Sequence, residues 1–302
     1  MNRHTKCLLA VLIAFGSVLY THAVFGAVIG QTLYEADPLS SSILKFAPNG
    51  NQTVFAGPIE EPIGLAFDKA GNLFEADILG VIYKFTANGT KSFFANVPYR
   101  SALIAFDSSG NLYAGDIHLG NIYEFTPSGA QSTFASGLTQ PYGLAFDRSG
   151  NLFETDTFSG HIYEFARGGV QSTFASGLNY PAHYLAGLAF DSSGNLFVSD
   201  YAAGDIYEFT PGGAQSTFAS GLNGPTGLAF DRNGNLFVSD SNSGHIYEFT
   251  PGGVQSTFAS GLNQPAGLAF QPVPEPAALV LMSIGAITRF GIRWKRRPRP
   301  SQ

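Results

Sequence analysis

The sequence contains very little cysteine, methionine or tryptophan, with one Cys, two Met and one Trp among 302 residues. Because Cys7 is the sole cysteine, no intramolecular disulfide can form and packing must stabilise the fold. The sequence also has no Gly-x-Ser-x-Gly, His-Glu-x-x-His or phosphate-loop motif. We therefore predict no catalytic residue and no cofactor from motifs.

Positive charge is scarce in the middle of the chain. Residues 27–272 contain 21 acidic and eight basic residues, a formal charge of −13, and the other basic residues lie at the two ends. Nucleic-acid binding needs a basic surface that neutralises phosphates. The composition therefore predicts that nucleic acid is not a partner.

Long apolar runs are absent except near the two ends. The N-terminal segment has a basic start at Arg3 and Lys6, a short apolar stretch over 7–20, and small residues up to Gly26. This order is typical of a secretory signal peptide and is short for a bilayer span. We predict a signal peptide over 1–26 and an exported protein; the alternative is an uncleaved membrane anchor.

Internal repeats dominate the remainder of the sequence. The phrase Ser-Thr-Phe-Ala-Ser-Gly-Leu occurs four times, first at 132–138, and Ile-Tyr-Glu-Phe occurs four times, first at 122–125. A period near 40 residues indicates a repeat architecture. One repeated position is marked by Asp68, Asp107, Asp147, Asp191 and Asp231.

Each repeat reads as four short strands. In the unit that starts at Gly227, segments rich in Phe, Tyr, Ile, Val and Thr alternate with Gly, Pro, Asn, Ser and Asp. Four antiparallel strands in about 40 residues form one blade of a β-propeller. We call these strands first to fourth from the channel outwards and number the blades from the one starting at Gly64.

Counting the strands gives six of each type, but the two ends of the repeat region are incomplete. The region begins with a second strand near Leu33 and ends with a first strand at 267–270. Pairing these ends would close the ring and remove open sheet edges. The sequence therefore predicts an all-β, six-bladed propeller over residues 28–271, in which 267–270 completes the blade of residues 32–57.

The repeat at 227–249, GLAFDRNGNLFVSDSNSGHIYEF, resembles NHL-repeat and gluconolactonase-like six-bladed propellers. In the gluconolactonase-like family this resemblance implies a divalent metal held at the channel mouth by Glu and Asn or Asp beside the first strands. None of the residue pairs leading into the first strands contains Asn, Asp or Glu, so the resemblance does not carry over its metal site and we predict no metal. These residues are Pro62-Ile63, Ser101-Ala102, Pro141-Tyr142, Leu185-Ala186, Pro225-Thr226 and Pro265-Ala266.

Blade four differs most from the others. The loop at 178–187 is four residues longer than its counterpart at 222–227. Aromatic side chains can stack on a ligand, and loops often carry binding residues. The candidate ligand-binding residues are Tyr180, His183, Tyr184 and Tyr201. The alternative is tolerated variation in loop length.

Other polar residues recur at the loops between second and third strands. His161, His245 and Asp205 could bind a metal by type, but they belong to different blades and are expected to lie too far apart. We predict solvated loop residues there, as for His118. An aspartate ends every second strand and is expected to cap its own turn: Asp37, Asp77, Asp116, Asp156, Asp200 and Asp240.

The C-terminal segment 272–302 has three parts. Val273, Pro274, Glu275 and Pro276 are followed by an apolar run over 277–288 and then by an arginine-rich end. This order is similar to the PEP-CTERM sorting signal. The resemblance implies a short transmembrane helix, processing by an exosortase-type sorting protease, and location at the cell surface or in the extracellular matrix of a Gram-negative bacterium. The alternative is a plain C-terminal anchor.

Two functions remain open from the sequence. The first is a non-catalytic surface propeller that binds an extracellular polysaccharide or a surface protein, which the near-identical blades favour. The alternative is an extracellular gluconolactonase-like hydrolase or lyase with a site around Tyr180, His183 and Tyr184.

Overall fold

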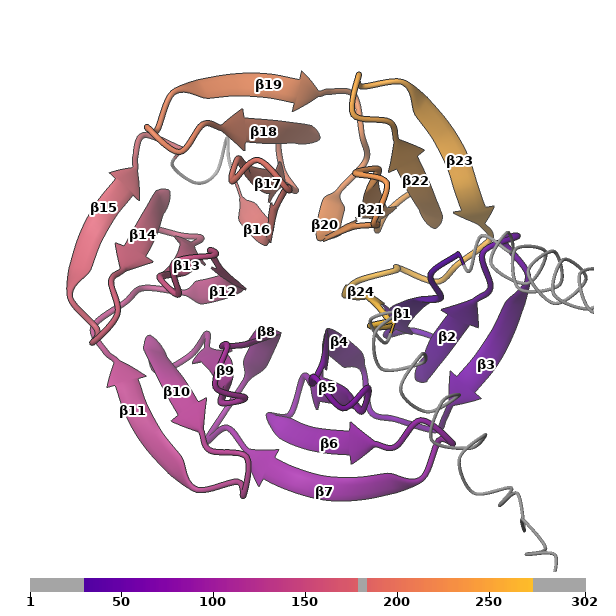
Figure 1. The fold of residues 1–302 in the computed structure, drawn as a ribbon, viewed down its shortest axis with the longest axis horizontal. Coiled ribbons are helices and arrows are strands. Elements are labelled where there is room, and N and C mark those ends of the chain that lie inside the picture. The colour runs from indigo at the N-terminus through magenta and orange to yellow at the C-terminus, as the bar shows by residue number, and fades with distance from the viewer. Residues whose placement is uncertain (1–29, 179–183, 274–302) are drawn as a thin grey trace, which may run out of the picture. The chain divides into compact units, whose positions relative to one another are not determined.

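The structure is a computed structural model that describes residues 30–178 and 184–273. These residues form six four-stranded antiparallel sheets arranged as blades around a central axis (Figure 1). The predicted six-bladed propeller is therefore confirmed. All regular elements in the described ranges are strands. These ranges contain no helix long and apolar enough to cross a bilayer. The apolar run 277–288, predicted to be a transmembrane helix, lies outside the described residues, as does the predicted signal peptide.

The strands follow the repeat. The first strands, which line the channel, are β4 (Pro62–Phe67), β8 (Ser101–Phe106), β12 (Pro141–Phe146), β16 (Leu185–Phe190), β20 (Pro225–Phe230) and β24 (Leu268–Phe270). The second strands are β5 (Leu73–Asp77), β9 (Leu112–Asp116), β13 (Leu152–Asp156), β17 (Leu196–Asp200), β21 (Leu236–Asp240) and β1 (Leu33–Asp37).

The outer half of each blade is built in the same way. The third strands are β6 (Val81–Phe85), β10 (Asn121–Phe125), β14 (His161–Phe165), β18 (Asp205–Phe209), β22 (His245–Phe249) and β2 (Ser42–Phe46). The fourth strands are β7 (Lys91–Asn96), β11 (Gln131–Ala135), β15 (Gln171–Ala175), β19 (Gln215–Ala219), β23 (Gln255–Ser260) and β3 (Gln52–Ala56).

The hairpin turn between first and second strands is set by an aspartate and a glycine. In blade five, Asp231 Oδ1 accepts the backbone N–H groups of Asn233 and Asn235, both at 2.8 Å. Gly234 has φ +83°, which L-residues with side chains rarely adopt. The Asp-x-x-Gly-Asn sequence therefore folds locally into the turn that reverses the chain.

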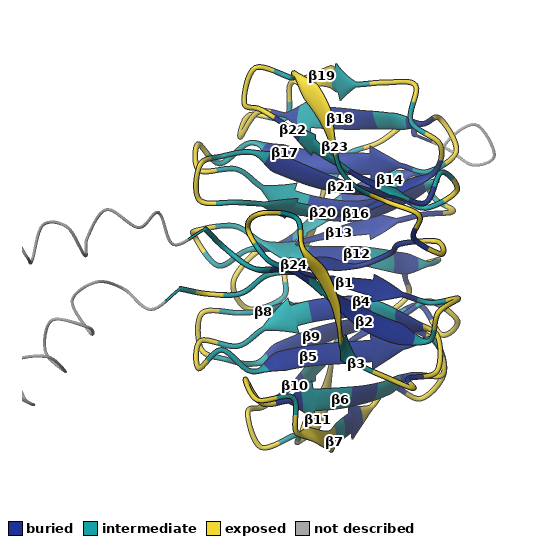
Figure 2. Ribbon diagram, turned by 90° about the vertical axis from the view of Figure 1, so that its right-hand side faces the viewer, coloured by how far each residue is buried: buried dark blue, intermediate teal, exposed yellow. Residues whose placement is uncertain are grey.

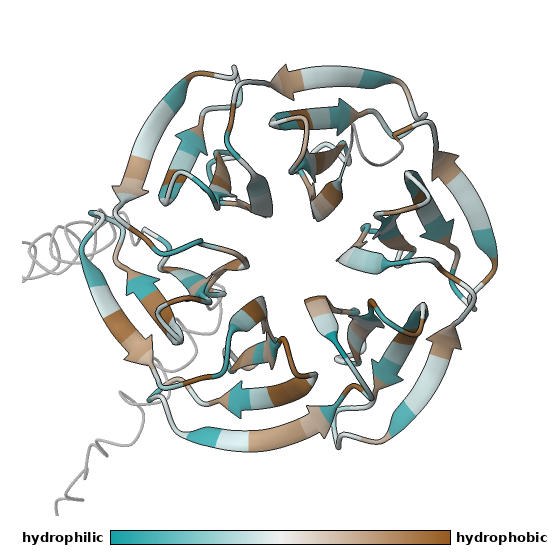
Figure 3. Ribbon diagram, turned by 180° about the vertical axis from the view of Figure 1, so that it is seen from behind, coloured by the Kyte–Doolittle hydropathy of each residue, from teal (hydrophilic) through white to brown (hydrophobic). Residues whose placement is uncertain are grey.

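The core lies between neighbouring blades. Phe197 of blade four contacts Phe218 of its own blade and Phe230 of blade five edge to face, with ring centroids 5.1 and 5.0 Å apart. The phenylalanine that ends each third strand is at most 2% exposed. These residues are Phe46, Phe85, Phe125, Phe165, Phe209 and Phe249. Figure 2 shows buried inner strands and exposed loops and outer strands, and Figure 3 shows outer strands that are pale or hydrophilic over much of their length.

Close backbone contacts join the blades around the channel. A Cβ on Gly227 would lie 2.2 Å from the carbonyl oxygen of Ala266 in the next blade, so only glycine fits there. Ser239 Oγ accepts the Gly227 N–H at 2.7 Å and donates to that same Ala266 oxygen. Thr155 and Ser199 make the equivalent pair of bonds in blades three and four.

The ring closes as predicted. β24 pairs with β1 in the register Leu33–Phe270, Tyr34–Ala269 and Glu35–Leu268. The loop before β24 is also bonded to β1, because Asp37 Oδ2 accepts the backbone N–H of Asn263 at 3.0 Å.

The loops gather on two faces of the ring. The upper face carries the loops between second and third strands and the loops between blades; the lower face carries the other hairpin loops. Gln31 Oε1 accepts the N–H of Arg232 from a lower-face turn at 2.7 Å. The Gln271 N–H donates to the Thr32 carbonyl at 2.9 Å. Both ends of the propeller therefore meet at the lower face.

Stopping the chain after Pro265 is expected to unfold the propeller. The change removes β24 and exposes the apolar cluster around Leu33 and Phe237, which should lower the free energy of unfolding by more than about 3 kcal/mol. Urea unfolding followed by circular dichroism measures it. A chain stopped after Gln271 keeps β24 and is the control. Equal midpoints for the two truncated chains would show that β24 does not hold the ring.

Candidate functional site

An aromatic cluster lies on the upper face and joins three consecutive blades. Tyr184, which precedes β16, contacts Tyr142 of β12 and Tyr201, with ring centroids 6.2 and 5.8 Å apart. Tyr201 Oη donates to Oδ1 of Asn242, from blade five, at 2.9 Å. Together, Tyr142, Tyr184, Tyr201 and Asn242 form what we call the tyrosine cluster. The three tyrosines are partly exposed and Asn242 is exposed.

Glycine and backbone contacts hold this cluster in place. A Cβ on Gly224 would lie 2.8 Å from the Tyr201 ring and 2.6 Å from Asn242 Nδ2, so a larger residue would displace both. The Tyr184 N–H donates to Asp200 Oδ1 at 2.9 Å, which fixes the end of the long loop. Burial raises the pKa of Tyr142 above its usual value, and Tyr184 adds to the shift, so its hydroxyl stays protonated.

The predicted site residues are partly brought together. Tyr184 and Tyr201 meet in the tyrosine cluster. Tyr180 and His183 lie outside the described residues. Tyr142, which the sequence placed only as a residue of a first strand, joins the cluster from the neighbouring blade. A tyrosine where other first strands carry Ile, Ala or Thr was the available signal.

The residues His161, Asp205 and His245, predicted to be solvated loop residues, instead begin the third strands β14, β18 and β22 and are partly buried beside local partners. His161 stacks on Tyr163 and His245 on Tyr247, each with centroids 5.4 Å apart. Tyr207 Oη donates to Asp205 at 3.3 Å. Among the residues that the structure describes, no three His, Cys, Asp or Glu side chains lie close enough to hold one metal ion.

The aspartates that end the second strands cap turns, as predicted. Asp77 Oδ1 accepts the Val81 N–H at 2.8 Å. Several of them also bind the loop that leads into their own blade, which the sequence did not predict. Asp240 Oδ1, for instance, accepts the Asn223 N–H at 2.8 Å. Each such carboxylate therefore joins two upper-face loops.

The metal site implied by the gluconolactonase-like resemblance does not fit this chain. The first strands begin with Pro, Ser or Leu, and the next residues are Ile63, Ala102, Tyr142, Ala186 and Thr226. None of these side chains offers the carboxylate or amide oxygen that such a site requires.

Three glutamates buried inside blades were missed by the sequence reasoning. Glu35, Glu75 and Glu154 occupy the middle of second strands, are 0% exposed, and have no hydrogen-bond partner at either carboxylate oxygen. Their blades read Leu-Tyr-Glu-Ala-Asp, Leu-Phe-Glu-Ala-Asp and Leu-Phe-Glu-Thr-Asp, where the other blades carry Ala or Val. Comparing that one position across the repeats would have found them.

Burial raises the pKa of all three carboxyl groups. It raises the pKa of Glu75 from 4.5 to about 9; Asp77 adds to the shift and Lys91 opposes it. Burial also raises the pKa values of Glu35 and Glu154, reinforced by Asp37 and Asp156 respectively. A neutral carboxylic acid avoids the larger cost of burying a charge.

The propeller should lose stability as pH rises from about 5 to 9. The folded protein binds the Glu75 proton more tightly than the unfolded chain, so the free energy of unfolding falls with pH between the two pKa values. Glu75→Gln should be more stable than the parent at pH 9, by about 1 to 3 kcal/mol, and should flatten the pH dependence. Urea unfolding at pH 5, 7 and 9 measures this. Exposed Glu61→Gln is the control, and a parallel pH profile for Glu75→Gln would contradict the assignment.

Many solved structures are similar to this chain, and three of them show that proteins of different kinds share the fold. A chain of a nidogen/laminin complex has a TM-score of 0.72 and 20% identity, and covers 80% of this chain and 99% of that one. A virginiamycin B lyase from Staphylococcus aureus has a TM-score of 0.57 and 16% identity over 70% of this chain and 77% of that one. A streptogramin B lyase has a TM-score of 0.58 and 16% identity over 78% and 76%. At these identities the likeness shows the fold alone.

Family models agree with the repeat and with the C-terminal segment. No curated protein sequence matches the chain. An NHL repeat matches residues 222–249, and a PEP-CTERM protein-sorting motif matches residues 272–297, which points to export and a Gram-negative cell surface. The model described as the SMP-30/Gluconolactonase/LRE-like region matches residues 26–218, more than half of the sequence. The chain therefore belongs to the SMP-30/gluconolactonase/LRE-like family.

Proposed function

We propose that this exported propeller is a non-catalytic binding module of the cell surface or extracellular matrix, and that it binds a polysaccharide or surface protein through the tyrosine cluster. The observation that carries the proposal is the contact of Tyr142, Tyr184 and Tyr201 across blades that otherwise repeat closely. Tyrosines at a surface supply large apolar faces at a small cost in conformational entropy, together with hydroxyl groups for hydrogen bonds.

The position of the cluster supports this function. Both ends of the propeller meet at the lower face, where Gln271 contacts Thr32, while the cluster lies on the upper face. The polar contact from Tyr201 to Asn242 fixes one ring in its orientation before binding, which lowers the entropic cost of binding.

The alternative is an extracellular hydrolase or lyase, and the virginiamycin B lyase neighbour shows that the fold can carry catalysis. Three features of this chain favour binding over that alternative. The first two residues of each first strand carry no carboxylate or amide side chain, and the nearest such groups are Glu61 before β4 and Gln140 before β12. Two of the upper-face histidines, His161 and His245, stack on tyrosines of their own strands. The buried glutamates are enclosed between blades, where a substrate does not reach them.

The double variant Tyr184→Ala, Tyr201→Ala should bind the polysaccharide or surface protein at least tenfold more weakly, because both aromatic rings are lost. Extracellular polysaccharide and surface protein from the producing cells, applied separately to the immobilised protein, distinguish the two kinds of partner. Phe93→Ala is the control, since that ring is 66% exposed on the outer strand β7. Lactone turnover that requires a divalent ion, or binding unchanged by the double variant, would contradict the proposal.

We further propose that an exosortase-type protease processes the C-terminal segment near Val273–Pro276. The matched motif covers residues 272–297 and supports this step, which would release a transient membrane anchor. Intact-mass measurement on protein isolated from the producing cells should give a chain that lacks Trp294. Pro274→Ala with Pro276→Ala should increase the share of the uncleaved form. A mass that retains the arginine-rich end would contradict processing.

A further inference from the structure

The lower face carries cavities at three successive blade junctions. Their volumes are about 570 Å³ between blades four and five, 530 Å³ between five and six, and 390 Å³ between three and four. Such volumes are typical of sites for small organic groups. The tyrosine cluster is on the other face of the ring and lines none of these three cavities.

The same side chains build each cavity. At the junction of blades four and five, Asn195 Nδ2 donates to Asp191 Oδ2 at 3.1 Å and to Glu208 Oε1 at 3.0 Å. The rings of Phe197 and Phe230 form the apolar floor. The equivalent amide contacts join Asn235 to Asp231 and Glu248, and Asn151 to Asp147 and Glu164, at 2.9 to 3.2 Å.

In the cavity between blades four and five, the carboxylates of Asp191 and Glu208 accept hydrogen bonds from N–H groups of the protein. Asp191 Oδ1 accepts the N–H groups of Ser193 and Asn195 at 2.7 and 2.8 Å. Glu208 uses Oε1 for the Asn195 amide, which leaves Oε2 as an acceptor. The negative charge is therefore partly compensated by N–H donors, and the wall still offers acceptors for hydroxyl groups.

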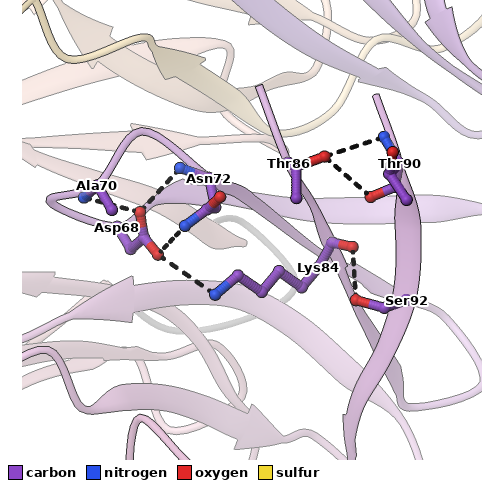
Figure 4. Close-up of polar contacts among 7 residues, drawn as sticks. All are labelled: Asp68, Ala70, Asn72, Lys84, Thr86, Thr90 and Ser92. Carbon is purple, nitrogen blue, oxygen red and sulfur yellow. Dashed lines mark hydrogen bonds and ion pairs between the residues drawn. The ribbon is translucent and has the colours of Figure 1, made fainter. Parts of the chain in front are cut away.

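Charge restricts what can bind. The described lining of the cavity between blades four and five contains Asp191 and Glu208 but no Lys, Arg or His. Each of the other two cavities has one arginine in its lining, Arg232 or Arg148, but the acidic residues still outnumber it. An anionic group would be repelled by two nearby carboxylates. Blade one has a different arrangement, because Lys84 occupies the position of the glutamate and pairs with Asp68 at 3.8 Å (Figure 4).

An apolar floor beside hydrogen-bond acceptors matches a sugar ring, which has a C–H face and hydroxyl groups around its rim. The partly exposed rings of Phe218 and Phe230, with Pro251, provide the carbon surface, and Asn233 and Glu208 provide polar groups. A row of equivalent sites fits a polymer built from repeated units. Linked sites bind a polymer far more tightly than each binds one unit.

We propose that the cavities at junctions three–four, four–five and five–six each bind a neutral sugar unit, so that the lower face binds a neutral polysaccharide at several points. This proposal does not depend on the tyrosine cluster, because the cavities lie on the lower face and the cluster lies on the upper face.

Tryptophan substitutions in three equivalent loops would block the cavities. A Cβ on Gly252 would meet only Thr250 Oγ1, at 4.0 Å, and one on Gly212 only Thr210 Oγ1, at 3.9 Å, so both loops have room for a side chain. Asn49 lines the cavity between blades five and six at the corresponding position. Val254→Trp is the matched control, since Val254 lies in the same turn as Gly252, is 67% exposed and lines none of the three cavities.

The probes are dextran, pullulan and galactomannan as neutral polymers, alginate as an anionic polymer and chitosan as a cationic polymer. We expect the purified protein to bind at least one neutral polymer. Gly252→Trp should weaken that binding about tenfold, and Gly212→Trp with Gly252→Trp and Asn49→Trp together at least a hundredfold. Val254→Trp should stay within twofold of the parent, and unchanged thermal unfolding of each variant shows that it is folded.

Three results would overturn the proposal. They are the absence of binding to every neutral polymer, binding to alginate or chitosan alone, and unchanged affinity of the triple tryptophan variant for the neutral polymer. Neutral-polymer binding that is lost in the Tyr184→Ala, Tyr201→Ala variant but kept in the triple variant would assign it to the upper face. That outcome would support the proposed function and refute the lower-face sites.

Discussion

The pairing of β24 with β1 is the constraint on which the structure depends. Each blade buries its side chains only against its two neighbours, so an open row of blades would expose two apolar surfaces. Three backbone-paired residues on β24 close the row, and Asp37 adds a bond to Asn263 across the join. With the ring closed, each of the six hydrophobic clusters spans two adjacent blades.

The close approach of the first strands limits how the blades can vary. Gly227 and Gly267 face carbonyl oxygens of the next blade at distances that exclude any Cβ. Where the second strand carries Thr155, Ser199 or Ser239, a hydroxyl bonds both blades. Variation is therefore concentrated in the loops at the two faces and at a few strand positions, such as Tyr142 in β12 and the buried glutamates in the middle of second strands.

The repeat predicted the strands, the blade number and the ring closure, because each depends on local turn chemistry and on counting. It also predicted that Asp77 and its counterparts cap turns. It did not predict the contact of Tyr142 with Tyr184, which depends on how two blades are placed side by side. Nor did it predict that Glu75 would lack a partner, because burial of one side of a strand depends on the neighbouring sheet.

The meeting of the two ends at the lower face has a consequence for the order of the chain. The Gln271 N–H is hydrogen-bonded to the Thr32 carbonyl, so a short linker could join these two residues without disturbing β24 or β1. The chain could then be opened in an exposed loop elsewhere, such as the turn at Arg167–Gly168, to give a circularly permuted propeller. The closed ring therefore does not require that the blades follow one another in the chain in this particular order of start and end.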